Sequence, residues 1–107
     1  MLPRKNRVGT KSIDEIFRRG KILSSPNLTF KFINTPTQDK KISFIAPKSV
    51  AKLAVKRNKL RRLGYSVLKK YINNFPVGLT GVFIFKKYQE DIFTIENEIK
   101  NILDKIN

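Results

Sequence analysis

The sequence predicts a small α+β sandwich, in which helices pack on one face of a sheet. Apolar residues recur at helical spacing in three segments and form short strand-like runs in three others. The order of these segments is helix, strand, strand, helix, strand, helix, which is typical of a two-layer α+β domain. With 107 residues and 40% apolar composition, the whole chain, 1–107, is expected to form one domain.

The N-terminal half is predicted to form one helix and two strands. Ser12 and Glu15 have the spacing of a capping box in front of an apolar stripe, which predicts a helix at about 12–19. Alternation of apolar and polar residues over 28–33 predicts a strand with one buried face. A second strand is predicted at 41–46, antiparallel to the first.

The C-terminal half is predicted to form a helix at about 53–74, a buried strand at 81–85 and an amphipathic helix from Ile92 to Ile106. Gly64 lies inside the first of these helices, where glycine is unfavourable, and close packing against the sheet is one explanation. Glu90 and Asp91 precede the last helix, where carboxylates suit the helix dipole. The aromatic residues assigned to the core are Phe30, Phe32, Phe83 and Phe85.

The charge of the chain indicates a phosphate-rich partner. Lys and Arg number 23 against 8 Asp and Glu, giving a formal net charge of +15 and a pI near 10.4. The apolar runs fall short of the ~20 residues that span a bilayer, and the N-terminus lacks the apolar core of a signal peptide. We therefore expect no membrane association, a cytoplasmic location and no obligate protein partner.

The chain has no Cys and no His. Disulfides and thiolate chemistry are excluded, and the commonest general base and metal ligand are missing. We expect neither a catalytic residue nor a metal site on the protein itself.

The strongest functional signal is a basic segment at 48–62, within an acid-free stretch that runs from Asp39 to Glu90. Such a segment is a candidate nucleic-acid contact, whereas the alternative is a solvated helix face with no partner. The candidate RNA-binding residues are Lys48, Lys52, Lys56, Arg57, Asn58, Lys59, Arg61 and Arg62, with Arg4 and Arg7 in the N-terminal arm. Arg57 and Arg61 are expected to be largely exposed, and Asn58 either to bond RNA or to brace the arginines.

The same segment resembles a known signature. The pattern Lys52-x-Ala54-Val55-x-Arg57-Asn58-x-x-Arg61-Arg62 is similar to the arginine-asparagine-arginine signature of the bacterial ribonuclease P protein subunit. A basic arm, a short helix ending in Phe17-Arg18-Arg19-Gly20, and the two following strands occur in the order of that family. The resemblance extends from about Leu2 to Leu103.

The resemblance implies a fold similar to a domain of a small-subunit ribosomal protein, and a role in maturing the 5′ end of transfer RNA. It implies that the protein binds the ribonuclease P RNA and the 5′ leader of precursor transfer RNA. The RNA subunit, with magnesium ions held mainly by RNA, would perform the endonucleolytic hydrolysis.

The leader cleft of that family is lined by aromatic residues on the first helix and the sheet, and the implied leader-binding residues here are Phe17, Lys31 and Ile13. Only Phe17 matches an aromatic position, and it is either a core residue or a stacking platform for a leader base. Lys31 stands where an aromatic residue is common and would contact leader phosphate instead. Lys59 replaces the second arginine of the signature, which keeps the charge but loses the planar donor group.

Two other functions remain open on the sequence alone. One is a ribosomal-type structural protein that binds folded RNA without any associated cleavage. The other is a DNA-binding module that places its basic helix in a major groove. Stimulation of precursor cleavage would separate the first alternative from the ribonuclease P subunit, and sequence-dependent binding of duplex DNA would indicate the second.

Overall fold

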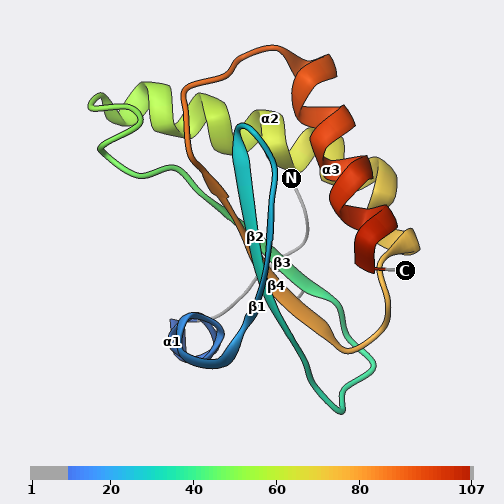
Figure 1. Cartoon of the computed structure of the whole chain (residues 1–107). Coiled ribbons are helices and arrows are strands. Elements are labelled where there is room, and N and C mark those ends of the chain that lie inside the picture. The colour runs from blue at the N-terminus through green and yellow to red at the C-terminus, as the bar shows by residue number, and fades with distance from the viewer. Residues whose placement is uncertain (1–9, 107) are drawn as a thin grey trace.

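A computed structural model describes residues 10–106 of the chain, with side chains from Ile13 onward. Figure 1 shows the helices and strands along the chain. They are α1 (Thr10–Arg19), β1 (Lys21–Ser24), β2 (Leu28–Asn34), β3 (Lys41–Ile45), α2 (Ala54–Tyr71, followed by a 3-10 turn at Ile72–Asn74), β4 (Leu79–Phe85) and α3 (Ile92–Ile106). The α+β class and the order of the predicted elements are confirmed, and β1 is an additional strand that the sequence did not predict.

The strands form one four-stranded sheet in the order β1-β2-β4-β3. β4 lies in the middle, antiparallel to β2 and parallel to β3, so that Phe83 is paired with Phe30 on one side and Phe44 on the other. β2 and β3 therefore run in opposite directions, as predicted, but they are not hydrogen-bonded neighbours. The parallel pair requires a crossover between β3 and β4, and α2 provides it.

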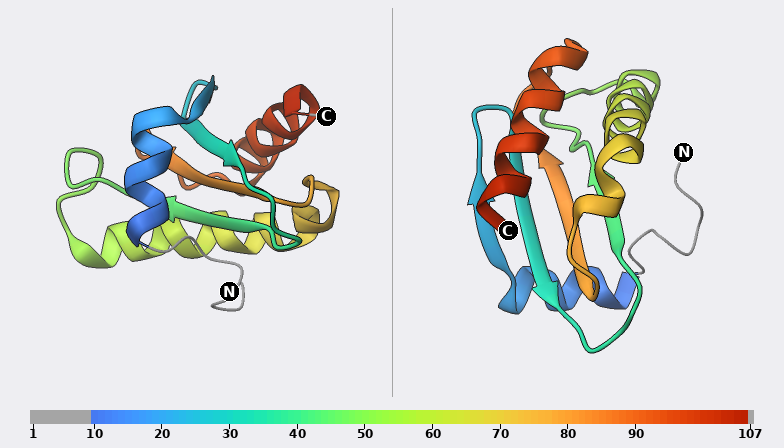
Figure 2. Two further views of the ribbon diagram at one scale, coloured as in Figure 1. Left: turned by 90° about the horizontal axis from the view of Figure 1, so that it is seen from below. Right: turned by 90° about the vertical axis from the view of Figure 1, so that its right-hand side faces the viewer.

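The helices cover both faces of the sheet, which corrects the expectation that all of them pack on one face. α2 and α3 lie together on one side, whereas α1 crosses the opposite side (Figures 1 and 2). The physical reason is a second, smaller apolar contact. Val82 points away from the main core and is fully buried, and Ile16 of α1 is buried as well. A short helix with one strongly apolar residue is enough to cover this patch.

The main core is a row of aromatic rings between the sheet and α2. The Phe30 and Phe83 rings stack with centroids 4.3 Å apart, and the Phe83 and Phe44 rings stack at 5.0 Å. Tyr65 of α2 meets the Phe44 ring edge-on at 5.1 Å, and its hydroxyl accepts a hydrogen bond from the Phe44 backbone N–H at 3.1 Å. Such offset and edge-on pairs stabilise a core by about 0.5–1.5 kcal/mol beyond the burial of their area.

Gly64 is explained by this packing. A Cβ atom at that position would lie 2.5 Å from the Phe44 ring, closer than real Cβ contacts allow. The absence of a side chain therefore lets α2 approach β3, which confirms the predicted close packing on the sheet. The fully buried Leu60 and Val67 fix the same face of the helix to the core. The polar face of α2 is consequently turned to solvent.

α1 begins before its predicted N-terminus, whereas α3 begins at Ile92, as predicted. α1 begins at Thr10, before the predicted capping box, so Glu15 lies inside the helix and pairs with Arg19 instead. Asp91 does cap α3: its Oδ1 accepts a hydrogen bond from the Phe93 N–H at 3.1 Å, and its Oδ2 from the Thr94 hydroxyl at 2.8 Å.

The turn between β1 and β2 is anchored on α3 by the buried carboxylate of Glu98. This carboxylate accepts hydrogen bonds from the backbone N–H of Asn27 at 2.7 Å, from the Asn27 side-chain amide at 2.6 Å and from the Ser25 hydroxyl. These bonds fix the short β1 strand against the rest of the domain. Within residues 10–106, no helix has the length and hydropathy needed to cross a membrane.

Candidate nucleic-acid interface

The basic segment begins in a loop whose shape is set by backbone hydrogen bonds. The N–H groups of Val50 and Ala51 donate to the Pro47 carbonyl at 3.0 and 3.2 Å, and this turn leads into an extended Leu53. The carbonyl of Leu53 then accepts the N–H groups of Lys56 and Arg57, both at 3.1 Å, which starts α2. The loop and the first turn of the helix thus form one continuous, ordered basic surface.

Arg57 stabilises this loop. Its Nη1 donates hydrogen bonds to the carbonyls of Ala51 at 3.0 Å and Lys52 at 2.7 Å. The side chain is half-buried, which corrects the expectation that it is largely exposed. Arg57 therefore has a positioning role in the free protein, because it orients the loop that carries Lys48 and Lys52.

Asn58 braces Arg61, one of the two roles considered for it. The amide oxygen of Asn58 accepts a hydrogen bond from Nη2 of Arg61, one helical turn further on. Arg61 is half-buried rather than largely exposed, whereas Arg62 beside it is exposed. The bond restricts the guanidinium of Arg61 before any partner arrives, which lowers the entropy lost when it binds.

Glu90 is a carboxylate partner of the basic helix α2, although its position in the sequence suggested a role at the start of α3. Nζ of Lys59 lies 3.2 Å from Oε1 of Glu90, and the Tyr88 hydroxyl donates to the same oxygen. The hydrogen bond from Tyr88, followed by the one from Lys59, lowers the pKa of Glu90, and the Glu90 carboxylate raises the pKa of Tyr88. No local pattern signals this contact, because the residues are about 30 positions apart in sequence.

A second set of candidate residues lies where α1 crosses the sheet. The Phe17 side chain is 46% exposed, so it is not a core residue, whereas Ile16 beside it is buried. Nζ of Lys31 on β2 lies 4.6 Å from the centroid of the Phe17 ring. The structure thus brings together Phe17 and Lys31, with the half-buried Ile13 on the same helix.

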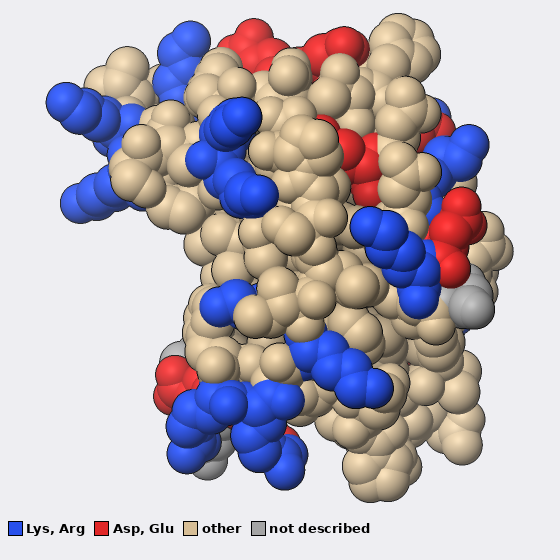
Figure 3. Space-filling view, in the orientation of Figure 1, with Lys and Arg blue, Asp and Glu red and all other residues tan. Residues whose placement is uncertain are grey.

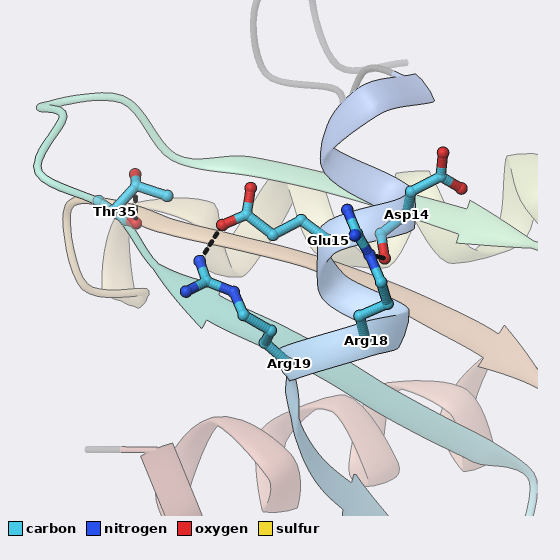
Figure 4. Close-up of polar contacts among 6 residues, drawn as sticks. Asp14, Glu15, Arg18, Arg19 and Thr35 are labelled. Carbon is cyan, nitrogen blue, oxygen red and sulfur yellow. Dashed lines mark hydrogen bonds and ion pairs between the residues drawn. The ribbon is translucent and has the colours of Figure 1, made fainter.

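The C-terminal turn of α1 adds two exposed arginines that the sequence analysis did not include among the site residues. Figure 4 shows Arg19 reaching back to Glu15, with which it forms an ion pair, while Nε of Arg18 lies 3.5 Å from the Asp14 carbonyl. Both belong to the Phe17-Arg18-Arg19-Gly20 sequence, so the signal was present. Cations at a helix C-terminus also suit the helix dipole.

The charged surface has two basic regions with a hollow between them. In Figure 3, Lys and Arg side chains project at the upper left, over the start of α2, and gather again at the lower left, over α1. The surface between the two groups is hollowed and carries few charges. Among the candidate residues of α2 and the loop before it, Lys48, Lys52, Lys56 and Arg62 are exposed. Arg4 and Arg7 lie outside the described residues.

Comparison with known proteins assigns the family. The model of the family described as Ribonuclease P matches residues 2–107. The chain belongs to the ribonuclease P protein family. It is a ribonuclease P protein subunit, whose partner is RNA. Among curated proteins, none matches the sequence closely enough to count as a relative.

Solved structures of ribonuclease P proteins share the fold. The protein from Thermotoga maritima is 21% identical, with a TM-score of 0.83 over 94% of this chain and 97% of that one. The protein from Staphylococcus aureus is 16% identical, with a TM-score of 0.82 over 95% of this chain and 98% of that one. At such low identity the likeness concerns the backbone, so the roles of individual residues stay predictions.

Proposed function

We propose that this subunit uses the start of α2 to bind the ribonuclease P RNA and uses the hollow beside α1 to hold the 5′ leader of precursor transfer RNA. The observation that carries this proposal is the pairing of the two sites. The basic region over the start of α2 borders a hollow that has α1 on its other side (Figure 3), and Arg57 and Arg61 of α2 are held in place by hydrogen bonds. A subunit with both sites can hold enzyme RNA and substrate RNA at once.

The basic surface is suited to phosphate rather than to one base sequence. Lys59 and Lys56 are point charges on flexible stems, and Arg61 offers a planar donor group held in place by Asn58. Contacts of this kind position an RNA backbone and release its counterions, but they carry little sequence information. This agrees with a protein that recognises a folded RNA subunit.

The exposed surface around Phe17 on α1 is suited to a single strand. Phe17 presents a partly exposed ring on which an unpaired base can stack, and Lys31 lies over that ring with its ammonium group. We propose that the leader base stacks on Phe17 and that Lys31 contacts the neighbouring phosphate. Ile13 supplies apolar surface at the same site.

The hydrolytic step is proposed to belong to the RNA. The sequence has no His and no Cys, and within residues 10–106 no group of three acidic, His or Cys side chains is arranged to hold a metal ion. Magnesium would be held mainly by RNA phosphates, since this hard cation prefers oxygen ligands. The location proposed with this function is the cytoplasm, where bacterial precursor transfer RNA is transcribed.

Reconstitution tests the proposal. The full chain is mixed with a bacterial ribonuclease P RNA at low magnesium concentration, and cleavage of precursor transfer RNA is scored with and without protein. We expect the protein to raise kcat/KM for the precursor. An unchanged rate, with a folded protein by circular dichroism and RNA bound, would instead favour a structural RNA-binding protein without cleavage activity.

A further inference from the structure

A second apolar hollow lies on the α2 side of the molecule. It has a volume of about 300 Å³ and is lined by Ala51, Lys52, Leu53, Lys56 and Tyr88. The hollow is shallow and largely open to solvent. The walls come from the loop before α2, the first turn of α2 and the segment between β4 and α3.

The apolar surface of this hollow is exposed and held in place. Leu53 is 61% exposed and Tyr88 is 37% exposed, so both side chains present apolar surface to solvent. The Tyr88 hydroxyl donates a hydrogen bond to Glu90, which is itself paired with Lys59. These contacts fix the orientation of the Tyr88 ring. Arg57 fixes the loop that lines the hollow by donating hydrogen bonds to the carbonyls of Ala51 and Lys52.

The charges around the hollow favour an anionic ligand. Nζ of Lys56 lies 5.6 Å from the centroid of the Tyr88 ring, and Lys52 also lines the hollow with its side chain exposed. The nearby carboxylate of Glu90 is already paired with Lys59. A flat apolar group with phosphates on either side matches this arrangement, and an unpaired nucleotide of RNA has that chemistry.

We propose that this hollow binds one unpaired nucleotide of RNA, with its base against Tyr88 and Leu53 and its flanking phosphates at Lys52 and Lys56. The site is separate from the Phe17 site on α1, and it rests on the proposed RNA-binding function. It gives the basic helix an element that recognises single-stranded RNA, in addition to its contacts with phosphate. A bulged or looped nucleotide would bind there, whereas a continuous duplex would not.

The test compares two short single strands with equal numbers of phosphates, an oligoadenylate and its abasic analogue. Affinities are measured by fluorescence anisotropy with the full chain carrying Phe17→Ala, so that the α1 site does not contribute. Tyr88→Ala should weaken oligoadenylate binding by about 5-fold or more, the low end expected for loss of one stacking ring, and leave the abasic strand unchanged. Tyr88→Phe keeps the ring and should retain most of the affinity.

Phe93→Ala is the matched control, because this aromatic residue on α3 is 73% exposed and lies outside the hollow. It should change neither affinity. Leu53→Ala removes an exposed side chain from the hollow and should cause a smaller loss that is again confined to oligoadenylate. If a thermal melt shows that Tyr88→Ala does not fold, the affinities of Leu53→Ala decide whether the hollow binds a nucleotide.

Equal weakening of both strands, no weakening by Tyr88→Ala or Leu53→Ala, or the same loss with Phe93→Ala would overturn this site. If both strands bind in a salt-dependent way but Tyr88→Ala changes neither affinity, this site is overturned, whereas the proposed electrostatic binding of RNA is not. If the unsubstituted chain binds neither strand at low salt, this site is overturned as well, whereas the proposed function is decided separately by binding of the chain to a bacterial ribonuclease P RNA.

Discussion

Replacing Phe17 with Ala tests the leader site, because the structure predicts different effects on folding and on binding. A fully buried Phe truncated to Ala costs about 3–5 kcal/mol of stability. Phe17 is 46% exposed, so roughly half of that loss, about 1.5–2.5 kcal/mol, is expected in the free energy of unfolding. Loss of a base stacked on the ring should cost about 1–3 kcal/mol of binding free energy.

The assay measures the affinity of the reconstituted enzyme for precursor and for mature transfer RNA, together with a thermal melt of the free protein. The loss should appear only with the precursor, because mature transfer RNA has no leader. Lys31→Ala should cause a smaller loss and reduce the salt dependence, since its Nζ lies 4.6 Å from the Phe17 ring centroid and would face the same strand.

The double variant adds a further check. Because the two side chains are in contact, their effects on precursor binding should be non-additive, by about 0.5–1 kcal/mol for an exposed cation–π pair. Equal losses for precursor and mature product, or a large drop in melting temperature without any loss specific to the leader, would refute the leader site.

Three further outcomes follow from the structure. Affinity for RNA should fall as salt rises, with log K decreasing by about 0.7–0.9 per phosphate contact for each unit of log salt, and a flat response would contradict the electrostatic account. Gly64→Ala should lower the melting temperature, because the added Cβ would lie 2.5 Å from the Phe44 ring. The overpacking penalty of about 1–3 kcal/mol should outweigh the gain in helix propensity of about 1 kcal/mol. A higher melting temperature would contradict this. Lys59→Met should raise the pKa of Glu90 toward its ordinary value, leaving the Tyr88 bond as the main cause that lowers it. Because the folded-state pKa is lowered, the stabilisation from this pair is present above the unfolded pKa and is lost as pH falls through the folded pKa. A carboxyl NMR titration measures the pKa, and an unchanged value would rule out the Lys59 contact.

The elements with strong periodicity could be predicted from sequence, and the arrangement of the sheet could not. β2 and α3 have clear alternation or helical stripes over seven or more residues. β1 has four residues, and three of them are exposed, so it lacks the buried alternation that marks a strand. The central place of β4 depends on contacts between distant segments, which no local pattern records.

In the functional site, too, features marked by local sequence patterns could be predicted and contacts between distant segments could not. The signature residues of α2 were named from their order in the sequence, and their contacts with RNA stay a prediction. The position of Gly64 suggested close packing, which the structure shows. The buried share of Arg57 was missed, because its partners are backbone carbonyls whose position depends on the loop. Tyr88 and Glu90 were missed as parts of the basic surface, because only the fold brings them to Lys56 and Lys59.

The central claim is that the start of α2 is the surface that binds the ribonuclease P RNA. The most direct measurement compares assembly with that RNA, by filter binding over a range of salt, for Arg61→Ala/Arg62→Ala and for Lys69→Ala/Lys100→Ala. Both pairs remove two positive charges, but Lys69 and Lys100 are exposed residues near the other end of α2 and on α3. We expect the arginine pair to weaken assembly and to reduce the log–log salt slope by roughly one to two units, and the lysine pair to change little. Equal losses for the two pairs would show that net charge alone drives assembly and would contradict the assigned surface.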